Sequence, residues 1–514
     1  MKMNWIKRLM FWSKDNKKDK RKKDDSFDKE LMEMDFYSQL AYLSAISSSG
    51  IDRDKLVYYA AKLPYISARY FRKVDFVAKM FNHDYPQACR IVGEKTTEPE
   101  VKAFLLRLSS ALASGEDVAL FLNRESRILA ESYGNNYERR LNLLKTWGDA
   151  YVALIMTTAL VTVMCVVSMM IGNVTTFFII SLSAVTIIAS FLGAYFLYKT
   201  APRELRIHSL PVRSKEQELT KSLNRVLIPV GLIILVLLIV MRVNMGGILL
   251  AIGVFLFPLG FVAVVDDSKI SKRDTEIATF LRSLGGVMQA IGATASEAMG
   301  RIEFRSLGSL KDNVDLLYSR ILNGISLNLC WDRFVGESGS EQINRGVRMF
   351  WDGISMGGEP QKVGNEASDF TMKIAFLRAK RSQIAAGFTW LTIAMHAVLC
   401  TLSVFIYSIF GTFSKLVNTM TPTTDNTGAL ALPNIPTLGL FNQSGGYLTL
   451  LHFMVLTVVL VLTISNALSI HFVNGGHNRK LLFYLALTTA ITGAVLIIVP
   501  PLVNKIFTPM VTTK

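Results

Sequence analysis

The titratable and nucleophilic side chains of this 514-residue chain lack the spacings that catalysis requires. Its six histidines are scattered singly, and no HExxH pair that could hold zinc occurs. The four cysteines show no CxxC spacing, so neither a zinc site nor a disulfide framework is indicated. No GxxxxGK[ST] loop, GxGxxG turn or GxSxG elbow is present. The sequence therefore predicts no catalytic, cofactor-binding or metal site, and any energy from ATP must come from a partner.

Charged motifs recur instead, with a fixed spacing. Val92-Gly93-Glu94 is followed by Gly115-Glu116, and Val335-Gly336-Glu337 is followed by Gly358-Glu359; the two glutamates lie 22 residues apart in each case. A shared ungapped spacing, with apolar segments after each block, predicts an ancient duplication. Coincidental helix-ending glycines are the alternative. Charges in the first turn of a helix would account for these glutamates, and a shared functional surface is the other interpretation.

Composition indicates a membrane protein. Hydrophobic residues make up 51% and charged residues 19% of the chain, and the mean hydropathy is +0.34. The net charge of +16 suits nucleic acid, anionic lipid or an acidic protein as a partner. In a membrane protein, however, Lys and Arg first of all mark the cytoplasmic side.

The helical pattern predicts an all-α integral membrane protein with about seven transmembrane helices and two related cytoplasmic helical-bundle domains. The expected parts are a basic cytoplasmic segment at 1–30, a first helical domain at 31–148, four transmembrane helices in two hairpins at 149–266, a second helical domain repeating the first at 267–384, and three transmembrane helices at 385–514 with an outer loop at 412–447.

Basic loops fall on one side of this arrangement. The N-terminus is therefore expected in the cytoplasm and the C-terminus outside a multi-pass cytoplasmic membrane protein. The sequons at Asn173 and Asn442 both fall in expected outer loops, and whether either is glycosylated is left open.

Two segments, Leu329–Phe334 and Arg348–Asp352, place aromatic residues beside charges at helical spacing. Core packing and a docking face for another protein are both compatible with this pattern. Leu377–Arg381, directly before the membrane, is most simply a positive-inside anchor, with Glu138-Arg139-Arg140 as its counterpart. The candidate docking residues are Glu94, Glu116, Arg139, Arg140, Glu337, Arg345, Arg348, Glu359, Arg378, Lys380 and Arg381.

These features together resemble the platform proteins of type IV pili, type II secretion systems and archaella. The similarity is greatest to the archaellum/archaeal type IV pilus platform family (FlaJ), within the type II secretion F-domain superfamily, and covers about residues 31–503. The residues that carry it are Gly292–Glu297, Val335–Ser340, Gly357–Pro360, Leu377–Arg381 and Gly475-Gly476.

The resemblance implies a function and partners. Such proteins lie under a growing filament, bind a hexameric secretion ATPase and help lift pilin- or archaellin-like subunits out of the membrane; in the archaellum the same assembly drives rotation. Membrane lipids are further partners, nucleic acid is not expected, and a homodimer is expected by analogy. The extra hairpin at 226–265 favours the archaeal branch, while archaellum and adhesive pilus both stay open.

The competing class is a membrane transporter or channel with large cytoplasmic regulatory domains. Such a protein needs intramembrane polar groups for its substrate. The apolar spans contain few, chiefly His396 and Asn466, and interhelical hydrogen bonds would account for both. A membrane enzyme would need an acidic or histidine cluster, which the sequence lacks.

Overall fold

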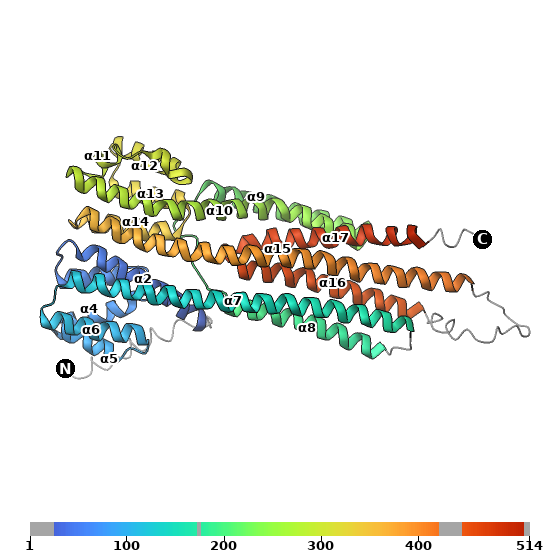
Figure 1. Ribbon diagram of the computed structural model, residues 1–514. Coiled ribbons are helices and arrows are strands. Elements are labelled where there is room, and N and C mark those ends of the chain that lie inside the picture. Colours follow the sequence, from blue (N-terminus) through green and yellow to red (C-terminus); the bar gives the residue numbers. More distant parts are fainter. Residues whose placement is uncertain (1–24, 172–175, 421–444, 508–514) are drawn as a thin grey trace, which may run out of the picture. The chain divides into compact units, whose positions relative to one another are not determined.

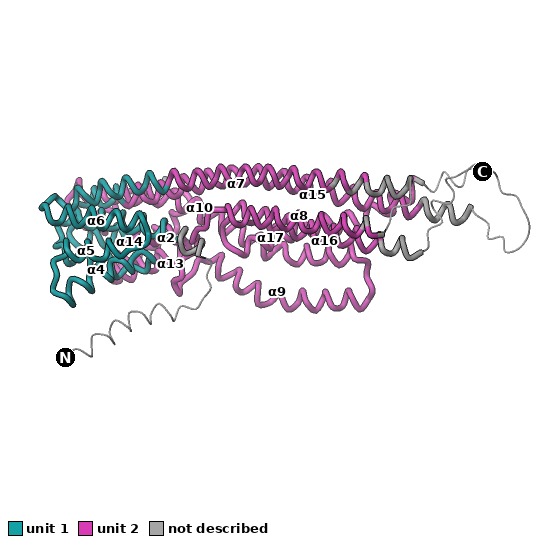
Figure 2. The backbone as a smooth tube through the Cα atoms, turned by 90° about the horizontal axis from the view of Figure 1, so that it is seen from below, with its two compact units in different colours: residues 1–133, 349–366 teal, residues 134–348, 367–514 magenta. Residues whose placement is uncertain are grey.

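The structure is a computed structural model that describes residues 25–171, 176–420 and 445–507 (Figure 1). Every regular element in these ranges is a helix, which confirms the predicted all-α class. The chain divides into two compact units (Figure 2). Unit 1 contains Met1–Tyr133 and Met349–Glu366, and unit 2 contains Gly134–Arg348 and Ala367–Lys514.

Unit 1 is a bundle built around its first helix. Tyr42, Leu43 and Ile46 of that helix are almost completely buried. The connections use the residues that end and start helices: Asn82 and Gly115 adopt left-handed conformations after their helices. The helices of unit 1 are α2 (Asp25–Ser47), α3 (Arg53–Lys62), α4 (Ala68–Phe81), α5 (Tyr85–Glu94), α6 (Pro99–Ser114) and the first part of α7 (Val118–Ile171).

A hairpin from much later in the sequence completes unit 1. It joins the end of α14 (Glu341–Ser355) to the start of α15 (Pro360–Met420). Tyr42 donates a hydrogen bond to Asp352 across 2.9 Å. A Cβ on Gly353 would lie 2.7 Å from a Val363 methyl carbon. The contacts therefore draw a boundary different from the predicted domain at 267–384, because residues 349–366 pack within unit 1.

The helical block predicted at 267–384 has the same helix order as the block predicted at 31–148. In both, a left-handed glycine follows a helix, Gly292 directly after α10 and Gly50 three residues after the end of α2, and a shorter helix comes next. Later, Val-Gly-Glu lies at the end of α5 and again at the end of α13, and a Gly-Glu turn precedes the long helices α7 and α15. This order is the one expected of a repeat. The additional elements are α10 (Met245–Ile291), α11 (Ala295–Met299), η1 (Phe304–Leu310), α12 (Lys311–Leu322) and α13 (Leu327–Ser338).

Six helices among the described residues are long and apolar enough to cross a membrane. They include parts of α8 (Thr176–Thr200), α9 (Lys215–Val240), α10, α15, α16 (Gly445–Asn474), and η3 (Asn478–Lys480) with α17 (Leu481–Phe507). The seventh predicted crossing belongs to the end of α7, next to residues outside the described ranges. Both sequons, at Asn173 and Asn442, also lie outside them. The predicted outer loop at 412–447 is shorter than expected, because α15 continues to Met420 and α16 begins at Gly445.

Helices α10 and α17 pack closely (Figure 1) because one face of α10 carries three glycines spaced seven residues apart, Gly246, Gly253 and Gly260. A Cβ on Gly253 would lie 2.9 Å from the carbonyl oxygen of Ala486, and one on Gly260 would overlap the backbone of Phe483. Gly246 faces Gly493 in the same way. Small residues let membrane helices approach until their backbones touch. The close packing of α10 on α17 thus depends on these glycines.

We expect Gly260→Ala to destabilise the protein by about 1–3 kcal/mol, since the added methyl group must push two helix backbones apart. Gly286→Ala on the same helix is the matched control, because a Cβ there meets nothing within 4 Å. That control should keep or slightly raise the thermal midpoint, since alanine favours a helix over glycine. Thermal melting of the purified protein in detergent measures both, and equal midpoints for the two variants would contradict the expectation.

A buried charge cluster as the candidate functional site

A segment without regular secondary structure, residues 201–214, carries the first charges of the site, all within unit 2. It connects α8 to α9. Side chains and backbone of other elements satisfy its polar backbone groups, which cannot remain unpaired when buried. Arg381 donates to the carbonyl oxygen of Pro202 at 2.6 Å, and Arg378 donates to that of Leu205 at 3.2 Å. The carbonyl oxygen of Arg206 accepts from the backbone N–H of Glu341 at 3.1 Å.

Arg378 on α15 is the centre of the cluster. Its guanidinium donates from Nε to Glu204 at 2.6 Å, and from Nη1 to Asp274 at 2.7 Å and Gln342 at 2.8 Å. The arginine is 6% exposed. A planar guanidinium fork can satisfy several acceptors at once, which is the condition for burying such a charge. Arg378 of α15 therefore links α10, α14 and the 201–214 segment through its hydrogen bonds and ion pairs.

The turn between α13 and α14 contributes polar side chains to the same cluster. Ser340 hydrogen-bonds to Asp274, and Gln342 donates to backbone carbonyl oxygens of Asp274 at 3.2 Å and Thr371 at 2.6 Å. On α14, Arg345 forms an ion pair with Glu341 at 3.0 Å. The Val335–Ser340 motif thus ends in a buried network rather than on a surface.

Arg381 closes the C-terminal end of α16. It donates to the carbonyl oxygens of Val473 at 3.1 Å and Phe472 at 3.0 Å, groups that a helix end leaves unpaired. Gly475 and Gly476 follow with φ of +65° and +89°. A Cβ on Gly475 would lie 2.5 Å from the Arg381 guanidinium carbon, so only glycine fits this turn.

Asp267 carries a second set of ion pairs beside the first. Its carboxylate oxygens lie 3.0 Å from Arg206 and 3.0 Å from Lys480, so two cations share one buried carboxylate. A Cβ on Gly476 would approach Asp267 to 2.9 Å. The late Gly475-Gly476 pair is therefore explained by the two charges packed against it, Arg381 and Asp267.

The electrostatics of the cluster lower the pKa of Glu204 and Asp267, whereas burial raises the pKa of Asp274. Burial opposes the ionisation of Glu204, but Arg378 and Arg381 outweigh it and lower the pKa of its carboxyl group to about 2. Burial also lowers the pKa of His208, so this ring stays neutral. Its Nε2 lies 3.1 Å from the carbonyl oxygen of Gly336 and its Nδ1 accepts from the N–H of Leu210, so the proton is on Nε2.

Gly336 of the Val-Gly-Glu motif also has a steric role. A Cβ there would lie 2.6 Å from Val212, so the glycine lets the 201–214 segment rest on α13. In unit 1, a Cβ on Gly93 would lie 3.2 Å from Leu105. Both motif glycines therefore lie at close contacts between neighbouring segments.

The recurring glutamates form local ion pairs. Glu94 pairs with Arg90 and Glu337 with Arg320. Both lie at the C-terminal ends of α5 and α13, so the prediction that first-turn charges explain them is wrong for these two. A negative charge is unfavourable at a helix C-terminus, and the arginine partner offsets it. Glu116 and Glu359 do precede α7 and α15, and they pair with Arg124 and Lys362.

The structure corrects part of the predicted docking set. Arg345, Arg378 and Arg381 are 2%, 6% and 6% exposed, so they form the interior of unit 2 and their side chains are not on a docking surface. Lys380 pairs with Glu138 at 2.6 Å. Among the remaining candidate cations, Arg139 is exposed, whereas Arg140 and Arg348 are half-buried.

Core packing explains the aromatic segments that could have formed a docking face. Trp331 and Phe334 in unit 2, and Phe350 in unit 1, are at most 2% exposed. These aromatic rings are therefore unavailable to a partner.

Polar residues inside the membrane are satisfied by one another. Asn466 lies with Nδ2 3.0 Å from Nδ1 of His396, and Tyr151 donates to Oδ1 of Asn466 at 2.8 Å. His396 Nε2 is 3.0 Å from the Thr492 hydroxyl. The predicted interhelical hydrogen bonds of His396 and Asn466 are thus confirmed. The sequence offered no sign that Tyr151 belongs to this network.

The most important residues of the cluster, Glu204, Asp267, Asp274 and Gln342, were missed as site residues at the sequence level. The sequence did contain one indication of Asp267 and Asp274. Aspartates that follow an apolar span are energetically costly near the membrane unless a cation pairs with them. Within the described ranges no group of His, Cys, Asp or Glu could hold a metal ion. The arrangement provides charge neutralisation and mechanical attachment, and its carboxylates are already occupied by cations.

A multi-pass, all-α membrane protein with two helical units and a buried ionic junction is the class that these observations define. The chain is 23% identical to "Flagella accessory protein J" of Methanocaldococcus jannaschii over 431 residues, 80% of this chain and 73% of that protein. It is 20% identical over 450 residues to the protein of the same name from Methanococcus voltae, 85% of this chain and 78% of the relative. The resemblance to the archaellum platform family is thereby confirmed. No family model and no solved structure matches the chain.

We expect Glu204→Gln to destabilise the protein by about 3–5 kcal/mol, because it leaves a buried arginine short of a charged partner. Glu94→Gln is the control: its ion pair with Arg90 is exposed and its loss should cost less than about 1 kcal/mol. Thermal melting at pH 7 measures both, and a midpoint for Glu204→Gln equal to that of the unmodified protein would refute the role given to this residue.

The pH dependence provides a further check on the same pair of proteins. The folded-state pKa of Glu204 lies below its ordinary value of 4.5, so its contribution is complete above that pH and is lost as the pH falls towards about 2. The difference in thermal midpoint between the unmodified protein and Glu204→Gln should therefore shrink over this interval. A difference that stays constant from pH 7 to pH 2.5 would contradict the assignment.

Proposed function

We propose that this protein is a platform of an archaellum or type IV pilus-like machine, which couples a cytoplasmic hexameric ATPase to the insertion of pilin- or archaellin-like subunits. The relatives named Flagella accessory protein J favour the archaellum, in which the same coupling would drive filament rotation.

The observation that carries this proposal is the length of α7 and α15. They contain 54 and 61 residues, which at 1.5 Å per residue gives about 80 and 90 Å. The hydrocarbon core of a membrane is about 30 Å thick. Each helix therefore extends well beyond the membrane without a break, as a part that transmits movement from a cytoplasmic motor would require.

The chain itself supplies no nucleotide-binding loop, which supports a separate motor protein. The buried polar groups of the membrane helices are hydrogen-bonded to one another, which leaves little to bind a transported substrate. These two features favour a mechanical platform over a transporter or channel.

The proposed orientation places the N-terminus in the cytoplasm and the C-terminus outside. Lys199 at the end of α8 and the cations of the 201–214 segment, including Arg203, would lie on the cytoplasmic side. Lys505, near the end of α17, would then be outside.

Cysteine labelling tests this orientation. In intact cells, a membrane-impermeant maleimide should label Lys505→Cys, whereas Arg139→Cys should react only after the cells are permeabilised. Both positions are exposed, and the described native cysteines Cys89, Cys330 and Cys400 are buried, which limits background labelling. The reverse pattern would overturn the orientation.

The ATPase partnership can be tested with the full chain. Arg139→Glu should weaken co-purification with a hexameric secretion ATPase from the same organism, because Arg139 is the exposed cation among the candidates discussed above. Lys505→Glu makes the same charge change on the proposed opposite side and should leave co-purification unchanged. Binding by the unmodified protein should also decrease with salt. No association of the unmodified protein at low salt would contradict the proposal.

A further inference from the structure

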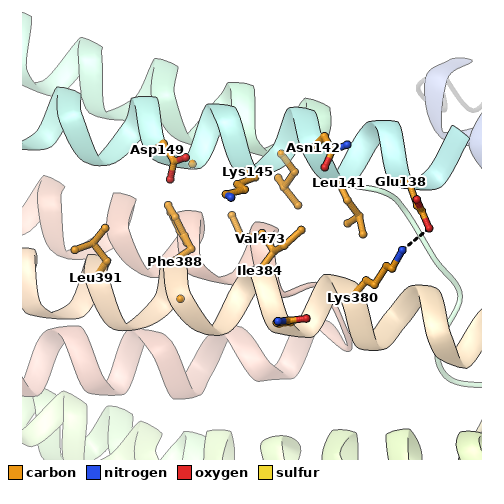
Figure 3. Close-up of a pocket in the computed structure, with 14 residues that line it drawn as sticks. Glu138, Leu141, Asn142, Lys145, Asp149, Lys380, Ile384, Phe388, Leu391 and Val473 are labelled. Atoms are coloured by element: carbon orange, nitrogen blue, oxygen red, sulfur yellow. Dashed lines mark hydrogen bonds and ion pairs between the residues drawn. The ribbon is translucent and has the colours of Figure 1, made fainter. Parts of the chain in front are cut away.

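A cavity of about 570 Å³ lies between α7 and α15 within unit 2 (Figure 3). It exists partly because Gly387 contributes no side chain to its wall, where a Cβ would meet nothing within 4 Å. Figure 3 shows the Glu138–Lys380 ion pair at one end and Asp149, Phe388 and Leu391 at the other. The α15 wall thus changes from polar to apolar along the helix direction, whereas the α7 wall carries charged side chains as far as Asp149.

Its polar side chains have unused bonding capacity. Lys145, Asp149 and Gln383 line the cavity, and within the described part of the chain none of these three side chains forms a hydrogen bond or ion pair. A lysine and an aspartate that face one cavity without pairing can bind a ligand that carries both an anionic group and a hydrogen-bond donor. Lys380 is already neutralised by Glu138, so Lys145 is the cation left for the anion.

Aromatic residues place this cavity at the membrane–water interface. Trp147 of α7 stacks on Phe196 of α8 with ring centroids 4.6 Å apart, and Trp390 of α15 is 76% exposed. Tryptophan is enriched at the depth of the lipid headgroups. Lys145 lies just before Trp147 on the cytoplasmic side, whereas Leu391 lies beyond Trp390 towards the membrane interior. Asp149 lies two residues beyond Trp147, so the charged α7 wall is at headgroup depth, and the apolar residues of α15 lead from there towards the hydrocarbon.

The volume limits what can enter. An α-helix with side chains is at least about 10 Å across, so little more than one turn would fill the cavity. A single acyl chain is thinner, and its methylene groups would contact Leu141, Ile384 and Phe388. The small volume, with a charged α7 wall facing the apolar residues of α15, matches an amphiphile better than a protein segment.

We propose that this cavity is a binding site for one phospholipid molecule. Its phosphate contacts Lys145, a hydroxyl or amine of the same lipid donates to Asp149, and one acyl chain lies along Ile384, Phe388 and Leu391. The lipid fills the gap between the two longest helices of the chain at the depth where they enter the membrane. This site is independent of the proposed partnership with an ATPase.

The test uses the full-length purified protein and native mass spectrometry. The probes are dioleoyl phosphatidylglycerol, dioleoylglycerol, which lacks the phosphate, and glycerol phosphate, which lacks the chains. We expect one tightly held phosphatidylglycerol per chain and at least about tenfold weaker binding of the other two. If dioleoylglycerol bound as tightly as phosphatidylglycerol, the phosphate would make no contact with the site. If glycerol phosphate bound as tightly, the site would bind free phosphate esters and not a lipid. Either result would overturn the proposal.

Two variants locate the site. Gly387→Leu should fill the cavity without a clash, because a Cβ there meets nothing within 4 Å, and should weaken retention of phosphatidylglycerol about tenfold. Gly411→Leu is the matched control on the same helix: its Cβ also meets nothing within 4 Å, it does not line the cavity, and its binding should be unchanged.

Lys145→Gln removes the unpaired cation without filling the cavity. It should weaken binding of phosphatidylglycerol but not the residual binding of dioleoylglycerol. Unaltered retention by Gly387→Leu, or by Lys145→Gln, would overturn the assignment to this cavity. Thermal midpoints near that of the unmodified protein verify that both variants fold.

Discussion

The burial of one guanidinium group, that of Arg378, constrains the structure of unit 2. Removing an arginine from water costs several kcal/mol unless its donors find acceptors, and here Glu204, Asp274 and Gln342 supply them. These acceptors come from three separate stretches of sequence. The irregular 201–214 segment must therefore reach α10, α14 and α15 before the charge can be buried, so the ionic pairing fixes the path of a connection that has no helix to define it.

Glycines provide the second constraint on the fold, because at three places they allow a close approach between two segments. Gly336 allows Val212 to approach, Gly475 allows Arg381 to approach, and the glycines of α10 allow the backbone of α17 to approach. In each case a Cβ would separate two segments that the fold brings together. The short motifs that resemble the platform family are thus explained largely by close packing and charge burial rather than by surface recognition.

Much of the architecture could be predicted from the sequence, because apolar runs and helix-ending residues are local signals. The all-α class, the long apolar helices and the hydrogen-bonded roles of His396 and Asn466 were accessible in this way. The buried locations of Arg345, Arg378 and Arg381 could not be predicted from the sequence. A basic residue before a membrane helix looks the same in sequence whether it faces water or a buried carboxylate, and Glu204 is more than 170 residues from Arg378. The assignment of 349–366 to unit 1 likewise depends on contacts such as Tyr42 with Asp352, distant in sequence.

That assignment has a consequence for biosynthesis. Unit 1 takes its final hairpin, residues 349–366, from beyond the crossing predicted at the end of α7 and the apolar helices α8, α9 and α10. A ribosome therefore releases the first 133 residues long before the piece that covers Tyr42 and Ala45 has been translated. Until then the nascent bundle lacks the hydrogen bond from Tyr42 to Asp352, and completion of the N-terminal unit must wait until α8, α9 and α10 have been translated.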